Sequence, residues 1–321
     1  MDIQILIDNL TNPALLFFFL GLLAVRLKSD LEIPGTSSKF ISLYLLFSIG
    51  FKGGQELSHS NLDLEIAWSL LFGVFLALAI PIYAFFLLKK KLGVPNAGAI
   101  AAAYGSVSAV TFVTAVSFLE VQQIQFDGHM VAVMALMEAP SIIIGVMLIK
   151  IFSKKDKDTV TSFGGVLKHA VTNGSVLLIM GSLVVGFLAN DSQAQGIEPF
   201  TTDIFKGFLA VFLLDMGIVS GRKLASFMEN GWQPLLFAVI IPLINGIVVA
   251  YCSQFITDNA GNQFLFAILA ASASYIAVPA AMKLAAPKAN PGLYLPMALG
   301  ITFPVNITIG MPLYLMIINY N

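Results

Sequence analysis

Charge is what this sequence has least of. Only 11% of its 321 residues are Asp, Glu, Lys or Arg, whereas 58% are hydrophobic. Soluble domains carry roughly 25% charged residues, so the composition excludes an ordinary soluble domain and indicates a chain that crosses a membrane several times. The formal net charge of −1 gives nucleic acid no electrostatic reason to bind, and no nucleic-acid partner is expected.

Cysteine and histidine are almost absent as well. The single cysteine, Cys252, excludes an internal disulfide and any metal site built from several cysteines. The three histidines, His59, His129 and His169, fall at the ends of apolar runs or between them. A buried proton relay or a histidine metal centre is therefore not expected, and the sequence predicts neither catalytic residues nor a cofactor.

Long apolar runs are what the sequence does contain. About 20 consecutive apolar residues span a bilayer as a helix. The predicted fold class is an all-α polytopic membrane protein with ten transmembrane helices, at about 12–27, 36–53, 64–88, 96–118, 128–152, 170–189, 201–221, 231–256, 262–284 and 291–318. The longest polar connection, 153–169, is too short for a soluble domain.

Lysine and arginine fix the expected orientation. Cytoplasmic loops carry an excess of these residues. If alternate loops face the cytoplasm, starting after the first span, all 17 Lys and Arg residues except Lys52 and Lys206 fall inside. Both termini then face outward, and the two halves have opposite orientations. This arrangement predicts a first five-helix repeat at 1–153, a cytoplasmic linker at 154–169 and a second, inverted five-helix repeat at 170–321.

Two stretches carry the internal repeat. NAGAIAAAYGSVSAVTFVTAVSF (96–118) aligns on NQFLFAILAASASYIAVPAAMKL (262–284), and a small-Ser-x-Ser turn interrupts each apolar run near its middle. SIGFKGGQEL (48–57) likewise aligns on DMGIVSGRKL (215–224) with its glycines in register. Matched interruptions in two halves of a membrane protein indicate the substrate site of a transporter. The alternative is that apolar helices resemble one another without sharing a function.

The chemistry of such interruptions suits a small anion together with a cation. Unwound backbone persists in a bilayer only where it lines a cavity or is buried in protein. The N-terminus of a half-helix offers unpaired N–H groups and a partial positive charge to an anion, while freed carbonyls and hydroxyls suit sodium. The candidate ligands are Ser106, Ser108, Ser272 and Ser274. The alternative is that these small residues only permit close helix packing.

Two carboxylates lie inside apolar spans, Glu138 in the fifth and Asp215 in the seventh. Intramembrane carboxylates are costly and by default mark ion paths, so we expect one or both to help hold a sodium ion. The alternative for Glu138 is an ion pair with a lysine near a membrane face. An intramembrane enzyme using both acids is less favoured, because Asp215 lies in LLDMGI rather than in a glycine-flanked turn. Asn306 is a further candidate to reach the site.

The chain resembles the sodium-dependent bicarbonate transporter family known from cyanobacteria. The likeness is sharpest at YGSVSAVTF (104–112), FLEVQQIQFDGHMVAVMALMEAP (118–140), AASASYIAVPAAMK (270–283) and PKANPGLY (287–294). It implies two inverted repeats, with broken helices four and nine crossing at the midplane and forming the substrate site. It also implies a core domain that moves against a scaffold domain, and a homotrimer in the bacterial inner membrane.

The same resemblance implies the function. The expected activity is secondary active transport of bicarbonate inward, coupled to sodium, by elevator-like alternating access. Another small anion, such as a short carboxylate, is the alternative substrate. A PII-like regulatory protein on the cytoplasmic face is an implied partner, although the family's long linker is short here.

The likeness departs at the second crossing. The family has an Asp after its serine run, where this chain has Tyr275, and Asp215 stands where the family's seventh helix is apolar. Either the sodium carboxylate has moved, or substrate and coupling differ. The repeat and the resemblance together give as substrate candidates Gly105, Ser106, Val107, Ser108, Thr111, Ser272, Ala273, Ser274 and Tyr275. The sodium candidates are Glu138, Asp215, Ser108 and Ser274.

Overall fold

The structure, a computed structural model, describes residues 11–59, 63–153, 172–227 and 231–320. It is 85% helical, and the described residues contain no strand. The all-α prediction is therefore confirmed. The predicted cytoplasmic linker, 154–169, falls outside the described residues.

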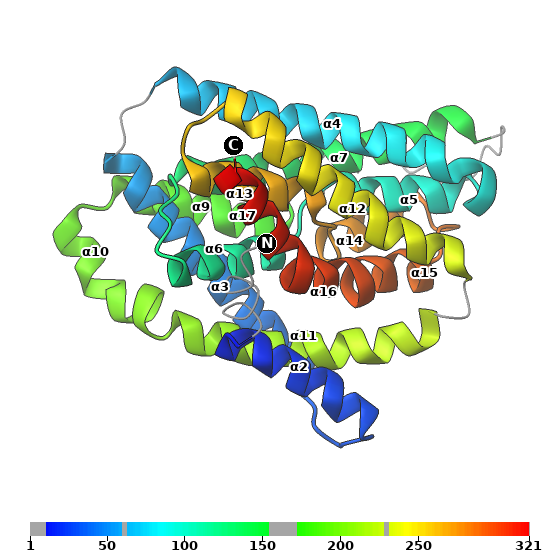
Figure 1. Cartoon of the computed structure of the whole chain (residues 1–321), viewed down its shortest axis with the longest axis horizontal. Coiled ribbons are helices and arrows are strands. Elements are labelled where there is room, and N and C mark those ends of the chain that lie inside the picture. Colours follow the sequence, from blue (N-terminus) through cyan, green and yellow to red (C-terminus); the bar gives the residue numbers. More distant parts are fainter. Residues whose placement is uncertain (1–10, 60–62, 154–171, 228–230, 321) are drawn as a thin grey trace.

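Helices make up most of the described chain (Figure 1). The first half contains α2 (Pro13–Arg26), α3 (Gly35–His59), α4 (Leu64–Leu92), α5 (Val94–Gly105), α6 (Ala109–Val121) and α7 (His129–Phe152). The second half begins with α9 (Gly174–Leu188), α10 (Asp191–Glu198), η1 (Pro199–Asp203), α11 (Phe205–Phe227), α12 (Trp232–Cys252) and η3 (Ser253–Phe255). It ends with α13 (Ala260–Ala271), α14 (Ala277–Ala285), α15 (Pro291–Pro296), η4 (Met297–Thr302), α16 (Phe303–Val305), η5 (Asn306–Gly310) and α17 (Met311–Tyr320).

Six helical stretches of the described chain are long and apolar enough to cross a membrane: Leu64–Leu92, Val94–Val121, His129–Phe152, Asp191–Leu224, Trp232–Phe255 and Pro291–Tyr320. Helices α2, α9 and α13 are apolar but shorter. Every predicted span overlaps a helix of the structure. Membrane-spanning capacity is thus present, while the count of ten spans and their inverted arrangement remain predictions.

The segment 190–200, expected to be a connection, is helical. Asn190 and Gln193 form a reciprocal capping box at the start of α10. The Asn190 side chain accepts a hydrogen bond from the Gln193 N–H at 2.9 Å, and the Gln193 side chain accepts one from the Asn190 N–H at 3.0 Å. An Asn-x-x-Gln pattern is a helix-start signal. The sequence analysis missed it because the segment lacks an apolar run.

The helices pack into two groups. In the first group, α2 packs along α11 and α3 along α9. In the second, α4 packs on α5 and α7, and α12 packs on α13 and α17. Helices α2 and α11 lie together at the lower edge of Figure 1, away from α4 at the upper edge. The groups meet where α11 packs on η4 and α15, and where α3 packs on α6 and α7.

Close packing in the first group depends on glycine. A Cβ atom at Gly217 in α11 would collide with the backbone of Phe18 in α2. A Cβ atom at Gly50 in α3 would lie 2.8 Å from the Ile179 oxygen in α9. Gly50 and Gly217 are matched positions of the internal repeat, and each brings its helix against the first helix of the opposite half. Small residues at helix contacts are what membrane-embedded packing requires.

Candidate substrate and ion site

The first interruption separates α5 from α6. Helix α5 ends at Gly105, and the backbone is extended at Ser106 and Ser108 before α6 begins. The Ser108 hydroxyl caps α6 by accepting a hydrogen bond from the Thr111 N–H at 3.1 Å. A Cβ atom at residue 105 would collide with the ring of Pro81 in α4, so glycine is required there. The break predicted near 105–108 is present.

The second interruption separates α13 from α14, between Ala271 and Ala277. The last carbonyls of a helix have no partner within it, and inside a membrane they must be paired. Asn245 in α12 donates to the Ala270 oxygen at 3.2 Å, and Asn306 in η5 donates to the Ala271 oxygen at 2.7 Å. Asn306 therefore reaches the break, as considered from the sequence. Asn245 was missed, although a lone amide inside an apolar span was a signal.

The two interruptions contact each other directly. The Ser108 N–H donates to the Ser272 hydroxyl oxygen at 3.0 Å, and the Ser274 N–H donates to the Ala103 carbonyl at 2.8 Å. The Ser272 hydroxyl in turn donates to the Leu269 carbonyl at 3.0 Å. Ser272 thus links the two interruptions, and its hydroxyl hydrogen is already donated to the Leu269 carbonyl.

Ser106 has a different position at the crossing. Its side chain is fully buried, and its hydroxyl has no hydrogen-bond partner within the described part of the chain. A buried polar group left without a partner costs about 1–3 kcal/mol. The neighbouring Val107 and Ala273 are also buried. This orphaned hydroxyl makes Ser106 a candidate ligand group at the crossing, although it does not line the small cavity beside it.

A small cavity of about 10 Å³ lies beside the crossing. Such a volume is on the order of that needed by one water molecule, and it suits a small ion equally well. Ser108, Ser274, Tyr275 and Glu138 line it. One carboxylate oxygen of Glu138 is buried without a hydrogen-bond partner, and no ion pair of Glu138 exists among the described residues. The lysine pair considered as the alternative for Glu138 is not formed there.

Asp215 lies near this cavity without lining it, since its charge acts on Tyr275, which does line it. Its carboxylate accepts a hydrogen bond from the Ser38 hydroxyl at the start of α3, and it is not among the residues that line the cavity. The adjacent Met216 is the residue that approaches Tyr275, whose hydroxyl donates to the methionine sulfur at 3.6 Å. Glu138 and Asp215 therefore do not share a pocket as a catalytic pair of carboxylates would.

Comparison with known families identifies the chain. A model of the Na⁺-dependent bicarbonate transporter superfamily matches residues 13–319. The chain belongs to this superfamily. The resemblance noted in the sequence is thereby confirmed over nearly the whole length. No curated protein matches the chain.

Membership makes the protein a membrane transport protein rather than a member of an enzyme family. The structure adds a residue pair near the transporter's crossing that the sequence analysis missed. The Thr302 hydroxyl donates to the Ala238 carbonyl at 2.7 Å, so Tyr104, 2.7 Å away, is the donor to Thr302. Tyr104 thereby ties α5 to the π-helical turn η4.

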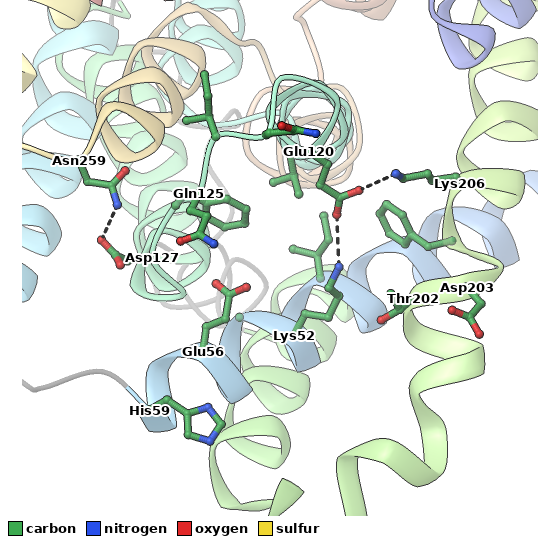
Figure 2. Close-up of a pocket in the computed structure, with 17 residues that line it drawn as sticks. Lys52, Glu56, His59, Glu120, Gln125, Asp127, Thr202, Asp203, Lys206 and Asn259 are labelled. Carbon is green, nitrogen blue, oxygen red and sulfur yellow. Dashed lines mark hydrogen bonds and ion pairs between the residues drawn. The ribbon is translucent and has the colours of Figure 1, made fainter.

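The transporter also contains a larger cavity of about 970 Å³, which we call the lysine cavity (Figure 2). Lys52 of α3 and Lys206 of α11 point into it toward Glu120, near the C-terminus of α6. Glu56 also lines this cavity, beyond the predicted span 36–53. Burial raises the pKa of the Glu56 carboxyl to about 7, and the charge of Lys52 acts in the opposite direction. The sequence analysis did not connect these residues.

Proposed function

We propose that this protein is a secondary active transporter that moves a small anion, bicarbonate in the first instance, together with sodium. One observation carries the proposal. Two broken helices contact each other at the crossing, and Glu138, one of whose carboxylate oxygens has no hydrogen-bond partner among the described residues, lines a cavity of ionic size beside them. Family membership supports bicarbonate as the substrate class.

The polar groups divide between the two ions by their chemistry. An anion needs donors, for which the Ser106 hydroxyl and the partial positive charge at the N-terminus of α6 are the candidates. The Ser108 and Thr111 N–H groups of that turn already donate to Ser272 and Ser108. A sodium ion needs oxygen ligands and a compensating negative charge, because a buried charge without a partner is strongly unfavourable. Ser108, Ser274 and Tyr275 supply oxygens in the small cavity, and Glu138 supplies the charge. In this proposal Asp215 stabilises the contact with Ser38 instead.

Helix pairing supports two inverted repeats and a moving core. If α9 repeats α2 and α11 repeats α3, the observed pairs α2–α11 and α9–α3 are equivalent contacts. The pairs α4–α5 and α12–α13 are equivalent in the same way. We propose that the second group of helices carries the crossing and moves against the first group, as elevator-like alternating access requires. A homotrimer in a bacterial inner membrane and a PII-like regulator remain proposals from the family resemblance.

Uptake of labelled bicarbonate into proteoliposomes tests the function. Uptake is expected to rise when sodium is higher outside than inside, and a potassium gradient of equal size is the control. Unlabelled formate and acetate, added in excess, distinguish the alternative substrates, because a transported short carboxylate competes for the same site. Bicarbonate uptake that does not depend on the sodium gradient contradicts sodium coupling. Absence of uptake for bicarbonate, formate and acetate, each supplied in labelled form, contradicts the proposed function.

Topology is tested by cysteine labelling in sealed cells. Cys252 is exposed, so it is first replaced by serine. An impermeant maleimide is then expected to label Ser192→Cys in the exposed helix α10, because the predicted orientation places 190–200 outside. Ser153→Cys, at the end of α7, is the matched inward-facing control. Labelling of position 153 with protection of position 192 overturns the orientation.

A further inference from the structure

Two lysines stand out in both the sequence and the structure. Lys52 and Lys206 are the Lys and Arg residues that the predicted topology places outside, against the general excess of these residues in cytoplasmic loops. They lie far apart in the chain, on α3 and α11, yet both contact Glu120. A positive charge that runs against the topology signal needs a function of its own.

The contact has the geometry of a bound carboxylate. The Lys52 ammonium lies 3.3 Å from one carboxylate oxygen of Glu120, and the Lys206 ammonium lies 3.3 Å from the other (Figure 2). Each oxygen of a planar O–C–O group therefore faces its own cation. Bicarbonate and short carboxylates present the same group. The two ammonium groups are thus arranged to bind such an anion. In this structure the Glu120 carboxylate occupies that position.

The two ion pairs are accessible enough for a dissolved anion to replace the Glu120 carboxylate. The side chains of Lys52, Glu120 and Lys206 are 34%, 29% and 63% exposed. All three line the lysine cavity, whose volume is about 970 Å³. Exposed ion pairs contribute little stability, so a dissolved anion is able to compete with the Glu120 carboxylate. Glu56, Asp127 and Asp203 also line the cavity. Glu56 interacts with the charge of Lys52, and Asp127 accepts a hydrogen bond from Asn259 at 3.3 Å.

The two partners belong to different helix groups. Lys52 and Lys206 lie on α3 and α11 of the first group, whereas Glu120 lies on α6, which packs on α13 of the second group. Relative motion of the groups would pull Glu120 away from both lysines. Lys206 would then lose the carboxylate it contacts, and Lys52 would keep only the neighbouring charge of Glu56.

We propose that Lys52 and Lys206 form a second anion site, separate from the helix crossing, which bicarbonate or a short carboxylate occupies in place of Glu120. The ligand class rests on the proposed function. At this site the substrate competes with an internal carboxylate for the contact between the two helix groups. Anion binding and release of that contact are then the same event.

Binding of ¹³C-formate to the detergent-solubilised protein, followed by NMR line broadening, tests the site. The measurements use a Ser106→Leu background, in which the crossing is filled. Broadening is expected to persist in this background and to disappear in Lys52→Gln and Lys206→Gln. Glu120→Gln keeps the side chain's shape but frees both lysines, so the apparent affinity for formate is expected to rise about two- to fivefold, as for an exposed ion pair. Lys150→Gln, at the exposed end of α7, is the matched control and should bind as the background does.

The conservative Lys52→Arg and Lys206→Arg variants keep the charge and should retain binding, which guards against loss of folding in the glutamine variants. Unchanged formate affinity in folded Glu120→Gln overturns the proposal, because a purely structural bridge predicts that result. Binding that survives in the Lys52→Gln/Lys206→Gln double variant overturns it as well. Failure of the proposed function would show instead as absent sodium-dependent uptake by the wild-type protein, so the two failures are distinguishable.

Discussion

Ser106→Leu and Ser274→Leu are each expected to abolish anion uptake while leaving the amount of folded protein near the wild-type level. Both side chains are buried at the crossing, where the Ser106 hydroxyl has no partner in the described chain and Ser274 lines the small cavity. Leucine removes a polar ligand and fills the space that an ion needs. Proteoliposome uptake measures the loss, and size-exclusion chromatography of the purified variants measures folding.

Two matched variants separate this effect from packing. Ser106→Ala removes the hydroxyl without adding bulk, so it should weaken uptake rather than abolish it. Thr114→Leu lies on α6, where the threonine hydroxyl donates to the Val110 carbonyl of its own helix at 2.9 Å, and uptake should persist. Wild-type uptake in folded Ser106→Leu would remove the crossing from the transport path.

The helix breaks were predictable because their cause is local. A helix in an apolar environment needs all of its backbone groups paired, so a small-Ser-x-Ser turn inside an apolar run is itself a sign of unwinding. The turns at 105–108 and 271–274 occur at matched positions of a repeat, and this match alone predicts that they lie together. Asn306 was within reach of the same reasoning because it is a lone amide inside an apolar span.

The separate roles of the serines and of the two acids at the site were not predictable from the sequence. The serines of the two turns look alike in the sequence, yet the structure engages Ser272 in the crossing and leaves Ser106 without a partner among the described residues. Glu138 and Asp215 both read as intramembrane acids, and only the packing of α7 and α11 decides which one faces the cavity. The contact of Lys52 and Lys206 with Glu120 joins three distant parts of the chain. No periodicity in the sequence indicates this contact.

Glu138→Gln is expected to raise the sodium concentration for half-maximal uptake by about a hundredfold or more. The substitution keeps the side chain's shape but removes the negative charge from the cavity that Ser108, Ser274 and Tyr275 also line. Removing one partner of a buried charge pair costs about 3–5 kcal/mol, and every 1.4 kcal/mol is roughly a factor of ten in binding. Asp215→Asn is the matched control. It should retain sodium dependence, because the Asp215 carboxylate is bonded to Ser38 outside this cavity.

A rescue experiment distinguishes a sodium ligand from a structural role. Tyr275 lines the same cavity as Glu138, so Tyr275→Asp in the Glu138→Gln background returns a carboxylate to it and should recover part of the sodium affinity. The same Tyr275→Asp change in the Asp215→Asn background should not improve on that variant. Loss of sodium dependence in Asp215→Asn, with normal dependence in Glu138→Gln, would assign the counter-charge to Asp215. Normal sodium dependence in both variants would show that neither carboxylate supplies the counter-charge, and it would overturn the sodium site proposed at the crossing.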